Sequence, residues 1–326
     1  MTTRRQFNSR LTTLALLSAT LPRWAAAQQS DVVRVLVGFP PGGSGDTLAR
    51  RLIERLRGNY GSTVIVENKP GAGGQIAVSA LNAAAPDGNT LLLTPPAPIT
   101  VYPFTYKSLP YRPDDAQPVS LVCNFSFGFA VGPAVPESVR TLKDFMDWAR
   151  VTPAKAMFGS PAAGSTPHLL GSMLAKAAGV ELTHVPYRGD GPGLQDLLGG
   201  QVAGYSTVLG SYMPHLKSDR LRLLGVSSAT RSAIVPDVPT YREQGIALDM
   251  MEWMGVFAPK GTPAPVVQRI AGAVQAAVAH PEFAKGLAEF GMTPRSSTPQ
   301  VFAEQLRVET EMWRVEIKKL GFTAES

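Results

Sequence analysis

The stretch Gly38-Phe39-Pro40-Pro41-Gly42-Gly43-Ser44-Gly45-Asp46-Thr47-Leu48 follows a short apolar run and opens a helical pattern. A second stretch on the same plan lies 121 residues further on, Gly159-Ser160-Pro161-Ala162-Ala163-Gly164-Ser165-Thr166-Pro167-His168-Leu169. A strand, a Gly-Ser loop and a helix N-terminus leave first-turn amides unpaired, and the helix dipole adds positive potential. Each stretch therefore predicts an anion-binding loop.

The two stretches share five residues at one constant offset: Gly38, Pro40, Gly43, Ser44 and Leu48 recur as Gly159, Pro161, Gly164, Ser165 and Leu169. Each is followed by an apolar stripe at helical spacing, as expected of a helix that packs on a sheet. We therefore expect two half-sites that grip one small anion from both sides. The alternative is that α/β proteins reuse Gly-Ser turns simply because they cap helices well.

The first 27 residues resemble an export signal. Arg4 and Arg5 form a twin-arginine pair, a mildly apolar stretch runs from Leu11 to Leu21, and Ala25-Ala26-Ala27 offers a cleavage site before Gln28. The apolar stretch is too short for a membrane span. An ordinary Sec signal and a twin-arginine signal both fit, and either predicts a soluble periplasmic protein after cleavage near Ala27.

The leader carries four arginines and no acid, which leaves +2 of the chain's net charge of +6. Without a dense basic run that contains aromatic residues, nucleic-acid binding has little support. Cys123 is the only cysteine, so no intramolecular disulfide can form, and it lies too far from the leader to carry a lipid anchor. We expect a monomer with no cofactor and no metal.

The chain after the leader is too long for one compact core, so two domains are expected. Strands and helices alternate in each half, which predicts α/β domains with mainly parallel sheets flanked by helices. Two longer extended runs, 121–131 and 252–258, could cross between the halves. We therefore predict a discontinuous domain 1 (28–127 and 253–326, with the helical tail packed back on it), a domain 2 (128–252), and a ligand cleft at the hinge between them.

Further motifs recur along the chain, namely Glu67-Asn68-Lys69-Pro70-Gly71-Ala72-Gly73-Gly74, Pro86-Asp87-Gly88-Asn89-Thr90-Leu91, Leu109-Pro110-Tyr111, His184-Val185-Pro186-Tyr187-Arg188-Gly189, Asp196-Leu197-Leu198-Gly199-Gly200-Gln201-Val202, Pro236-Asp237-Val238-Pro239-Thr240 and Ala258-Pro259-Lys260-Gly261-Thr262-Pro263. Together with Pro40 to Asp46, in this order, they make the chain resemble the substrate-binding proteins of tripartite tricarboxylate transporters, the Bug family of periplasmic receptors. The resemblance runs from Val32 to Leu320.

The resemblance implies a two-domain periplasmic binding protein of the Venus-flytrap, type II-like fold that encloses a small carboxylate. It implies the membrane subunits of such a transporter as partners, and its two ligand loops map onto 40–46 and 161–168. The chain departs from the family pattern at Asn89, Asp190, Gly191, Ala203 and Thr207. Because Asp190 and Thr207 could lie near the distal end of the cleft, these departures put any ligand carried over from the family in doubt.

The candidate ligand-binding residues are those whose backbone amides and hydroxyls suit a carboxylate, which only accepts hydrogen bonds. They are Phe39, Pro40, Gly42, Gly43, Ser44, Asp46, Ala163, Gly164, Ser165, Thr166, His168, Tyr187, Arg188 and Thr207. Weaker candidates by topology are Gly73, Gly74 and the 94–98 loop.

Four of these candidates have a second interpretation. Asp46 would repel an anion, so a structural role at the helix start is favoured for it. His168 either donates to the ligand or merely occupies the first helical turn. Tyr187 and Arg188 follow a strand and could face the cleft, but an arginine is more often exposed to solvent.

An enzyme is the less favoured alternative. No metal-ligand spacing, nucleophile elbow or P-loop lysine is present among the motifs of the chain. An α/β hydrolase or transferase is therefore supported by fold class alone. A third alternative is an orphan receptor that feeds a sensor kinase. The sequence leaves the ligand open among aliphatic dicarboxylates, aromatic acids, amino acids and carboxamides.

Overall fold

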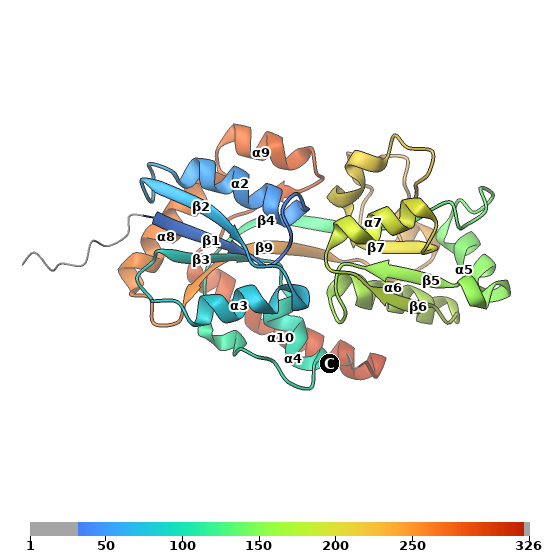
Figure 1. Ribbon diagram of the computed structural model, residues 1–326, viewed down its shortest axis with the longest axis horizontal. Coiled ribbons are helices and arrows are strands. Elements are labelled where there is room, and N and C mark those ends of the chain that lie inside the picture. The colour runs from blue at the N-terminus through green and yellow to red at the C-terminus, as the bar shows by residue number, and fades with distance from the viewer. Residues whose placement is uncertain (1–31, 323–326) are drawn as a thin grey trace, which may run out of the picture. The chain divides into compact units, whose positions relative to one another are not determined.

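Two long neighbouring strands organise the sheet of this protein. In the computed structural model, which describes residues 32–322, β4 (Ala116–Val131) and β9 (Met251–Pro259) pair along most of the length of β9. The strand order is β2-β1-β3-β9-β4-β7-β5-β6, with β8 and β10 also paired to β4. Figure 1 shows β1–β3 on one side of this pair and β5–β7 on the other. We call β1–β3 the first strand group and β5–β7 the second strand group. The leader at 1–27 falls outside the described residues.

The remaining strands are β1 (Val32–Val37), β2 (Thr63–Asn68), β3 (Thr90–Thr94), β5 (Met157–Ser160), β6 (Thr183–Pro186), β7 (Gly204–Val208), β8 (Arg222–Val226) and β10 (Thr293–Pro294). The α-helices are α2 (Ser44–Leu56), α3 (Gln75–Asn82), α4 (Tyr102–Thr105), α5 (Leu142–Val151), α6 (Thr166–Ala178), α7 (Asp190–Gly199), α8 (Ala264–Val278), α9 (Pro281–Ala288) and α10 (Pro299–Leu320). Shorter helical turns occur at Ala72–Gly74, Ala97–Val101, Pro113–Asp115, Pro153–Lys155, Leu209–His215 and Arg242–Gln244.

The α/β fold class is confirmed, with one correction to the sheet. β1 pairs parallel with β2 and β3, and β5 pairs parallel with β6 and β7, as expected. β4 and β9, however, pair antiparallel with β3, β7, β8 and with each other, which joins both strand groups into one mixed sheet. A strand that carries the chain back across the sheet must run opposite to the one that carried it over, and this produces the antiparallel centre.

The helices cover both faces of the first strand group. One face carries the stripe of α2, with Leu48, Leu52 and Leu56, together with Ile270 and Val274 of α8. The opposite face packs α3 and the start of α10 around Trp253, and Figure 1 shows α3 and α10 together on that side. Burial of each such side chain contributes about 1.5–3 kcal/mol. Helix α8 and the start of α10 therefore pack on β1–β3 and their neighbours, whereas Trp313 and Ile317 later in α10 also pack with Leu169 of α6.

The helical segment between β3 and β4 has no counterpart in the expected elements. Residues 97–105, placed partly in a loop by the sequence, form a π-helical turn and the short helix α4. Prolines at 96, 98 and 103 obscure the helical pattern there. By contrast, the capped start of α5 is as expected, because Thr141 and Asp144 form a reciprocal capping box. Among the described residues, no helix is both long and apolar enough to cross a membrane.

Helix α6 lies unusually close to the strand in front of it. A Cβ built on Gly171, in the middle of α6, would lie 2.1 Å from Cε2 of Phe158 on β5. Only a glycine allows this approach. This close approach sets the distance between the sheet and α6 with the loop at its N-terminus.

We expect Gly171→Ala to destabilise the fold by about 1–3 kcal/mol, because Phe158 must move out of a packed core. Gly272→Ala is the matched control, since Gly272 lies in α8 with no atom within 4 Å of its added Cβ. That change should stabilise the protein by about 1 kcal/mol through helix propensity. Urea unfolding of both variants measures the difference, and equal effects at the two positions would disprove the close-packing argument.

Candidate functional site

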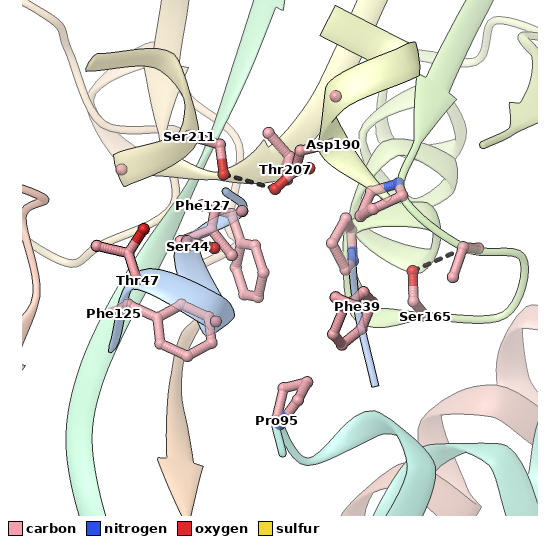
Figure 2. A pocket seen from close by; sticks show the side chains of 18 of the residues that line it. Phe39, Ser44, Thr47, Pro95, Phe125, Phe127, Ser165, Asp190, Thr207 and Ser211 are labelled. Atoms are coloured by element: carbon pink, nitrogen blue, oxygen red, sulfur yellow. Dashed lines mark hydrogen bonds between the residues drawn. The ribbon is translucent and has the colours of Figure 1, made fainter. Parts of the chain in front are cut away.

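One cavity lies where the two strand groups meet. Its volume is about 330 Å³, and its wall combines residues of the α2 loop, the α6 loop, the start of α7 and the crossing strands β4 and β9. Much of the wall is apolar, with Phe39, Phe125, Phe127 and Phe290 all contributing. Figure 2 shows Ser44 and Ser165 on different sides of it. The volume suits a ligand the size of a small organic acid.

The first predicted loop forms one wall. Phe39, Pro40, Gly42, Gly43 and Ser44 all line the cavity. Gly43 is the N-cap of α2, and no side chain caps the helix there. The first-turn amides at Ser44 and Gly45 are thus available where the wall is formed. Gly42 has φ +84°, whereas Gly43 has an ordinary φ of −74°, so the tight bend of the loop is at Gly42.

Asp46 acts on the loop and does not line the cavity. Its carboxylate accepts hydrogen bonds from the Gly42 amide at 3.0 Å, from Arg50 Nε at 2.9 Å and from Asn68 Nδ2 at 2.9 Å. Burial alone would raise the pKa of Asp46, but these hydrogen bonds together lower it. The favoured structural role therefore matches the contacts, which tie the loop to α2 and to the end of β2.

The second predicted loop contributes fewer residues. Ser165 and Thr166 line the cavity, whereas Ala163 and Gly164 do not. Ser165 is the N-cap of α6, but its hydroxyl donates back to the Ala162 carbonyl at 2.7 Å, so no side chain caps this helix. Gly164 has φ +67° and faces Thr105 instead of the cavity.

His168 lies behind this loop. Its Nδ1 accepts a hydrogen bond from the Gly164 amide at 3.0 Å, and its ring stacks on His184 with 3.4 Å between centroids. Burial lowers the pKa of His168 to about 4, and burial with the neighbouring ring lowers the pKa of His184 to about 3. Both rings are therefore neutral near pH 7. Of the two interpretations of His168, these contacts support a place in the first helical turn, from which the ring also holds the loop.

The last three predicted residues, Tyr187, Arg188 and Thr207, lie in different environments. The Tyr187 hydroxyl donates to Asp196 at 2.9 Å and lies outside the cavity wall. Arg188 is exposed, also outside it. Thr207 is buried, lines the cavity, and donates to Asp190 Oδ1 at 2.5 Å. Gly73 and Gly74 do not line the wall, whereas Pro95 and Ala97 of the 94–98 loop do.

Several wall residues were not anticipated from the sequence. They are Phe125, Phe127, Ser211, Glu252, Met254, Phe290 and Met292. Glu252 was detectable in principle, as a lone acid at the start of an apolar strand. The phenylalanines of β4 read simply as core residues, because only the meeting of the two strand groups turns them toward a cavity.

Glu252 is a buried acid in the wall. The Thr166 hydroxyl donates to its Oε1, which lowers the pKa of Glu252, but burial and, to a smaller extent, nearby Glu309 raise it to about 8 overall. It therefore carries a proton at pH 7. A neutral carboxyl group can face a bound anion without repelling it.

The charge of the wall is unusual for an anion site. Among the described wall residues, none is a lysine or arginine, the acids are Asp190 and Glu252, and the only histidine is His215. An anion would thus be held by helix N-termini and hydroxyls. Within residues 32–322, no three His, Cys, Asp or Glu side chains are gathered as a metal site would require.

Comparison with known proteins places this geometry in context. Residues 48–322 match the model of the tripartite tricarboxylate transporter family receptor. A UPF0065 protein of a Pseudomonas species, encoded in the tcbD-tcbE intergenic region, is 35% identical over 91% of this chain and 88% of its own. Protein BugT of Bordetella pertussis is 32% identical over 89% of each chain.

Solved structures are similar over nearly their whole length. The periplasmic binding protein BugD is 31% identical, with a TM-score of 0.84, over 90% of this chain and 99% of its own. An R. palustris protein solved with adipate is 30% identical, with a TM-score of 0.85, over 89% and 97%. MatC of Rhodopseudomonas palustris, with bound malate, is 29% identical, with a TM-score of 0.81, over 88% and 98%. The resemblance drawn from the sequence motifs is confirmed.

We expect Glu252 to make the fold less stable as pH rises. Between the unfolded pKa near 4.5 and the folded value of about 8, the folded protein binds the extra proton, so its stability falls with increasing pH. The histidines act with the opposite sign and below about pH 6.5, where stability is lost as pH falls. From pH 7 to 8.5, wild type should lose about 1 kcal/mol relative to Glu252→Gln. Urea unfolding at both pH values measures this, and parallel pH profiles for the two proteins would contradict it.

Proposed function

The chain belongs to the tripartite tricarboxylate transporter receptors, a family of solute-binding proteins, and from that premise we propose that it captures a small carboxylate in the cavity between its two strand groups. One observation carries the ligand class: the N-termini of α2 and α6, neither capped by a side chain, border the same cavity. Such termini favour an anion that only accepts hydrogen bonds. Adipate and malate occur in two similar structures, which supports the same class.

We propose that Phe39, Pro40, Gly42, Gly43, Ser44, Ser165, Thr166 and Thr207 contact the ligand, since they form the wall. Asp46, Ala163, Gly164 and His168 would act indirectly, by holding the two loops. We assign no ligand contact to Tyr187 or Arg188. On this division the two half-sites still hold the ligand from both sides, but more of the amides lie on the α2 side.

We also propose the two-domain division, with 28–127 and 253–326 in domain 1 and 128–252 in domain 2. It is supported by the pairing of β4 with β9 in its first part and with β7 and β8 in its second. Contacts cross the proposed boundary around the cavity: Tyr106 donates to the Ala163 carbonyl at 2.8 Å, and Gly189 lies against Pro40. The described conformation is therefore a closed one on this proposal, with hinges in β4 and β9.

Binding without turnover is the simplest role for this cavity. A serine does contact a histidine in the described residues, since Ser160 Oγ lies 2.8 Å from His184 Nε2. That pair is outside the cavity wall, Ser160 is fully buried, and its hydroxyl also donates to the Ala162 carbonyl. It is therefore poorly placed to attack a ligand.

The family and the leader together favour a periplasmic location. Two similar solved proteins are described as periplasmic, and the first 27 residues fit an export signal cleaved near Ala27. We propose that the protein, as a monomer from Gln28 onward, delivers its ligand to the membrane subunits of a tripartite tricarboxylate-type transporter.

We expect Gly43→Val to weaken carboxylate binding more than tenfold, about 1.4 kcal/mol, by placing a side chain over the α2 N-terminus. The fold should tolerate it, because Gly43 has a negative φ and its added Cβ meets nothing closer than the Pro40 carbonyl at 3.6 Å. Gly199→Val, equally unhindered but outside the wall, is the control. Calorimetry with mono- and dicarboxylates and their amides measures both, and a wild type that binds the amides but no acid would refute the carboxylate assignment.

We expect Tyr106→Phe to weaken ligand binding about threefold to tenfold, because it removes a hydrogen bond across the proposed domain boundary. Tyr60→Phe is the matched control, since the Tyr60 hydroxyl donates to the Gly88 carbonyl within domain 1. Small-angle scattering should show a larger radius of gyration without ligand, and more so in Tyr106→Phe. An identical radius in all states would rule out the hinge.

A further inference from the structure

Asp190 is the acid in the cavity that the proposed carboxylate does not explain. It is the first residue of α7, follows the N-cap Gly189, and lines the cavity. Figure 2 shows it grouped with Thr207 and Ser211 at one end of the view. A carboxylate ligand gains nothing from a second carboxylate nearby, so this acid needs another partner.

Both carboxylate oxygens of Asp190 have a hydroxyl partner. Thr207 donates to Oδ1 at 2.5 Å, and Ser211 donates to Oδ2 at 2.6 Å. Both oxygens accept, and such donors favour the ionised form of a carboxyl group. Burial raises the pKa of Asp190, and the two hydroxyl donors counteract part of that rise. Two dedicated hydroxyl donors are an arrangement that holds a negative charge inside the cavity.

No lysine or arginine pairs with Asp190 among the described residues. Asp190 makes none of the ion pairs there, and the only basic residue of the described wall is His215. The α7 dipole offsets part of the cost of removing this carboxylate from water. A carboxylate held in a cavity without a counter-charge is otherwise unfavourable. The remaining lone pairs of Asp190 are thus free for a ligand group that brings positive charge.

The aromatic part of the wall indicates which kind of segment would join the two charged ends of such a ligand. Phe39, Phe125 and Phe127 line the cavity, and Figure 2 labels all three among the residues around it. Aromatic walls favour an apolar segment and, through their faces, also tolerate a cationic group.

We propose that the ligand is a zwitterion, with a carboxylate at the helix N-termini, an apolar segment along the phenylalanines, and an ammonium group bound by Asp190. This inference rests on the proposed function and narrows its ligand class. Asp190 is the specificity-determining residue, oriented by Thr207 and Ser211. A dicarboxylate of the same length is disfavoured by repulsion at that end.

The test uses ligands that differ only at one end. The mature protein is titrated by calorimetry at pH 7 with 6-aminohexanoate, hexanoate and adipate, and with the corresponding sets of four and five carbons. At the length that fits, the amino acid should bind at least tenfold tighter than the plain acid, and the dicarboxylate weaker than the amino acid. Asp190→Asn, which preserves shape and can still hydrogen-bond Thr207 and Ser211, should abolish this preference while retaining the plain acid.

Asp196→Asn is the matched control, because it makes the same chemical change on the same helix outside the wall. It should retain the tenfold preference, and the apo thermal midpoints of both variants report whether the fold is intact. If plain acids and dicarboxylates bind as well as amino acids at every length, the zwitterion inference is overturned and the carboxylate function stands. If amino acids are preferred but Asp190→Asn keeps the preference, Asp190 is only a helix-terminal acid and the assignment is wrong. If no acid of any set binds, both proposals fail.

Discussion

The antiparallel pairing of β4 with β9 is the contact on which the remainder of the structure depends. These strands carry the chain from one strand group to the other and back, so each contributes to both groups. Their pairing fixes how far apart the parallel strands of the two groups lie. It also places Phe125 and Phe127 of β4, and Glu252 and Met254 of β9, in the wall of the cavity. On the proposed domain division, these two hydrogen-bonded strands are where the chain would bend.

The cavity combines features that would be contradictory in water. It is built for an anion, with two uncapped helix N-termini, yet it contains two acids and, among its described residues, no lysine or arginine. Burial raises the pKa of both acids, but their hydrogen-bond partners differ. Glu252 has one hydroxyl donor and a pKa of about 8, so it adds no charge near pH 7. Asp190 has two hydroxyl donors, which favour its ionised form, and on our proposal this form binds a positive group. The polarity of the site is therefore set by backbone dipoles at one end and by a carboxylate at the other.

The two ligand loops are held in different ways although their sequences are similar. The first is secured by Asp46, which collects hydrogen bonds from Gly42, Arg50 and Asn68. The second has His168 at the position after Pro167, where a ring nitrogen accepts from Gly164. An ionised acid and a buried neutral imidazole perform the same task of closing a loop onto the helix behind it. The internal repeat predicted two equivalent half-sites, but the contacts make them unequal.

Local sequence patterns determined the elements of this protein and the general position of its site. Alternating strands and amphipathic helices, the capping box at Thr141, and the Gly-Ser loops before α2 and α6 all depend on residues within a few positions of one another, so they could be predicted. The family could be predicted as well, from motifs in order. What the sequence could not show is which loop residues face the cavity, that β4 and β9 pair antiparallel, or that Asp190 meets Thr207 and Ser211. Those contacts join residues that are distant in the chain, and they exist only once the crossing strands bring the two strand groups together.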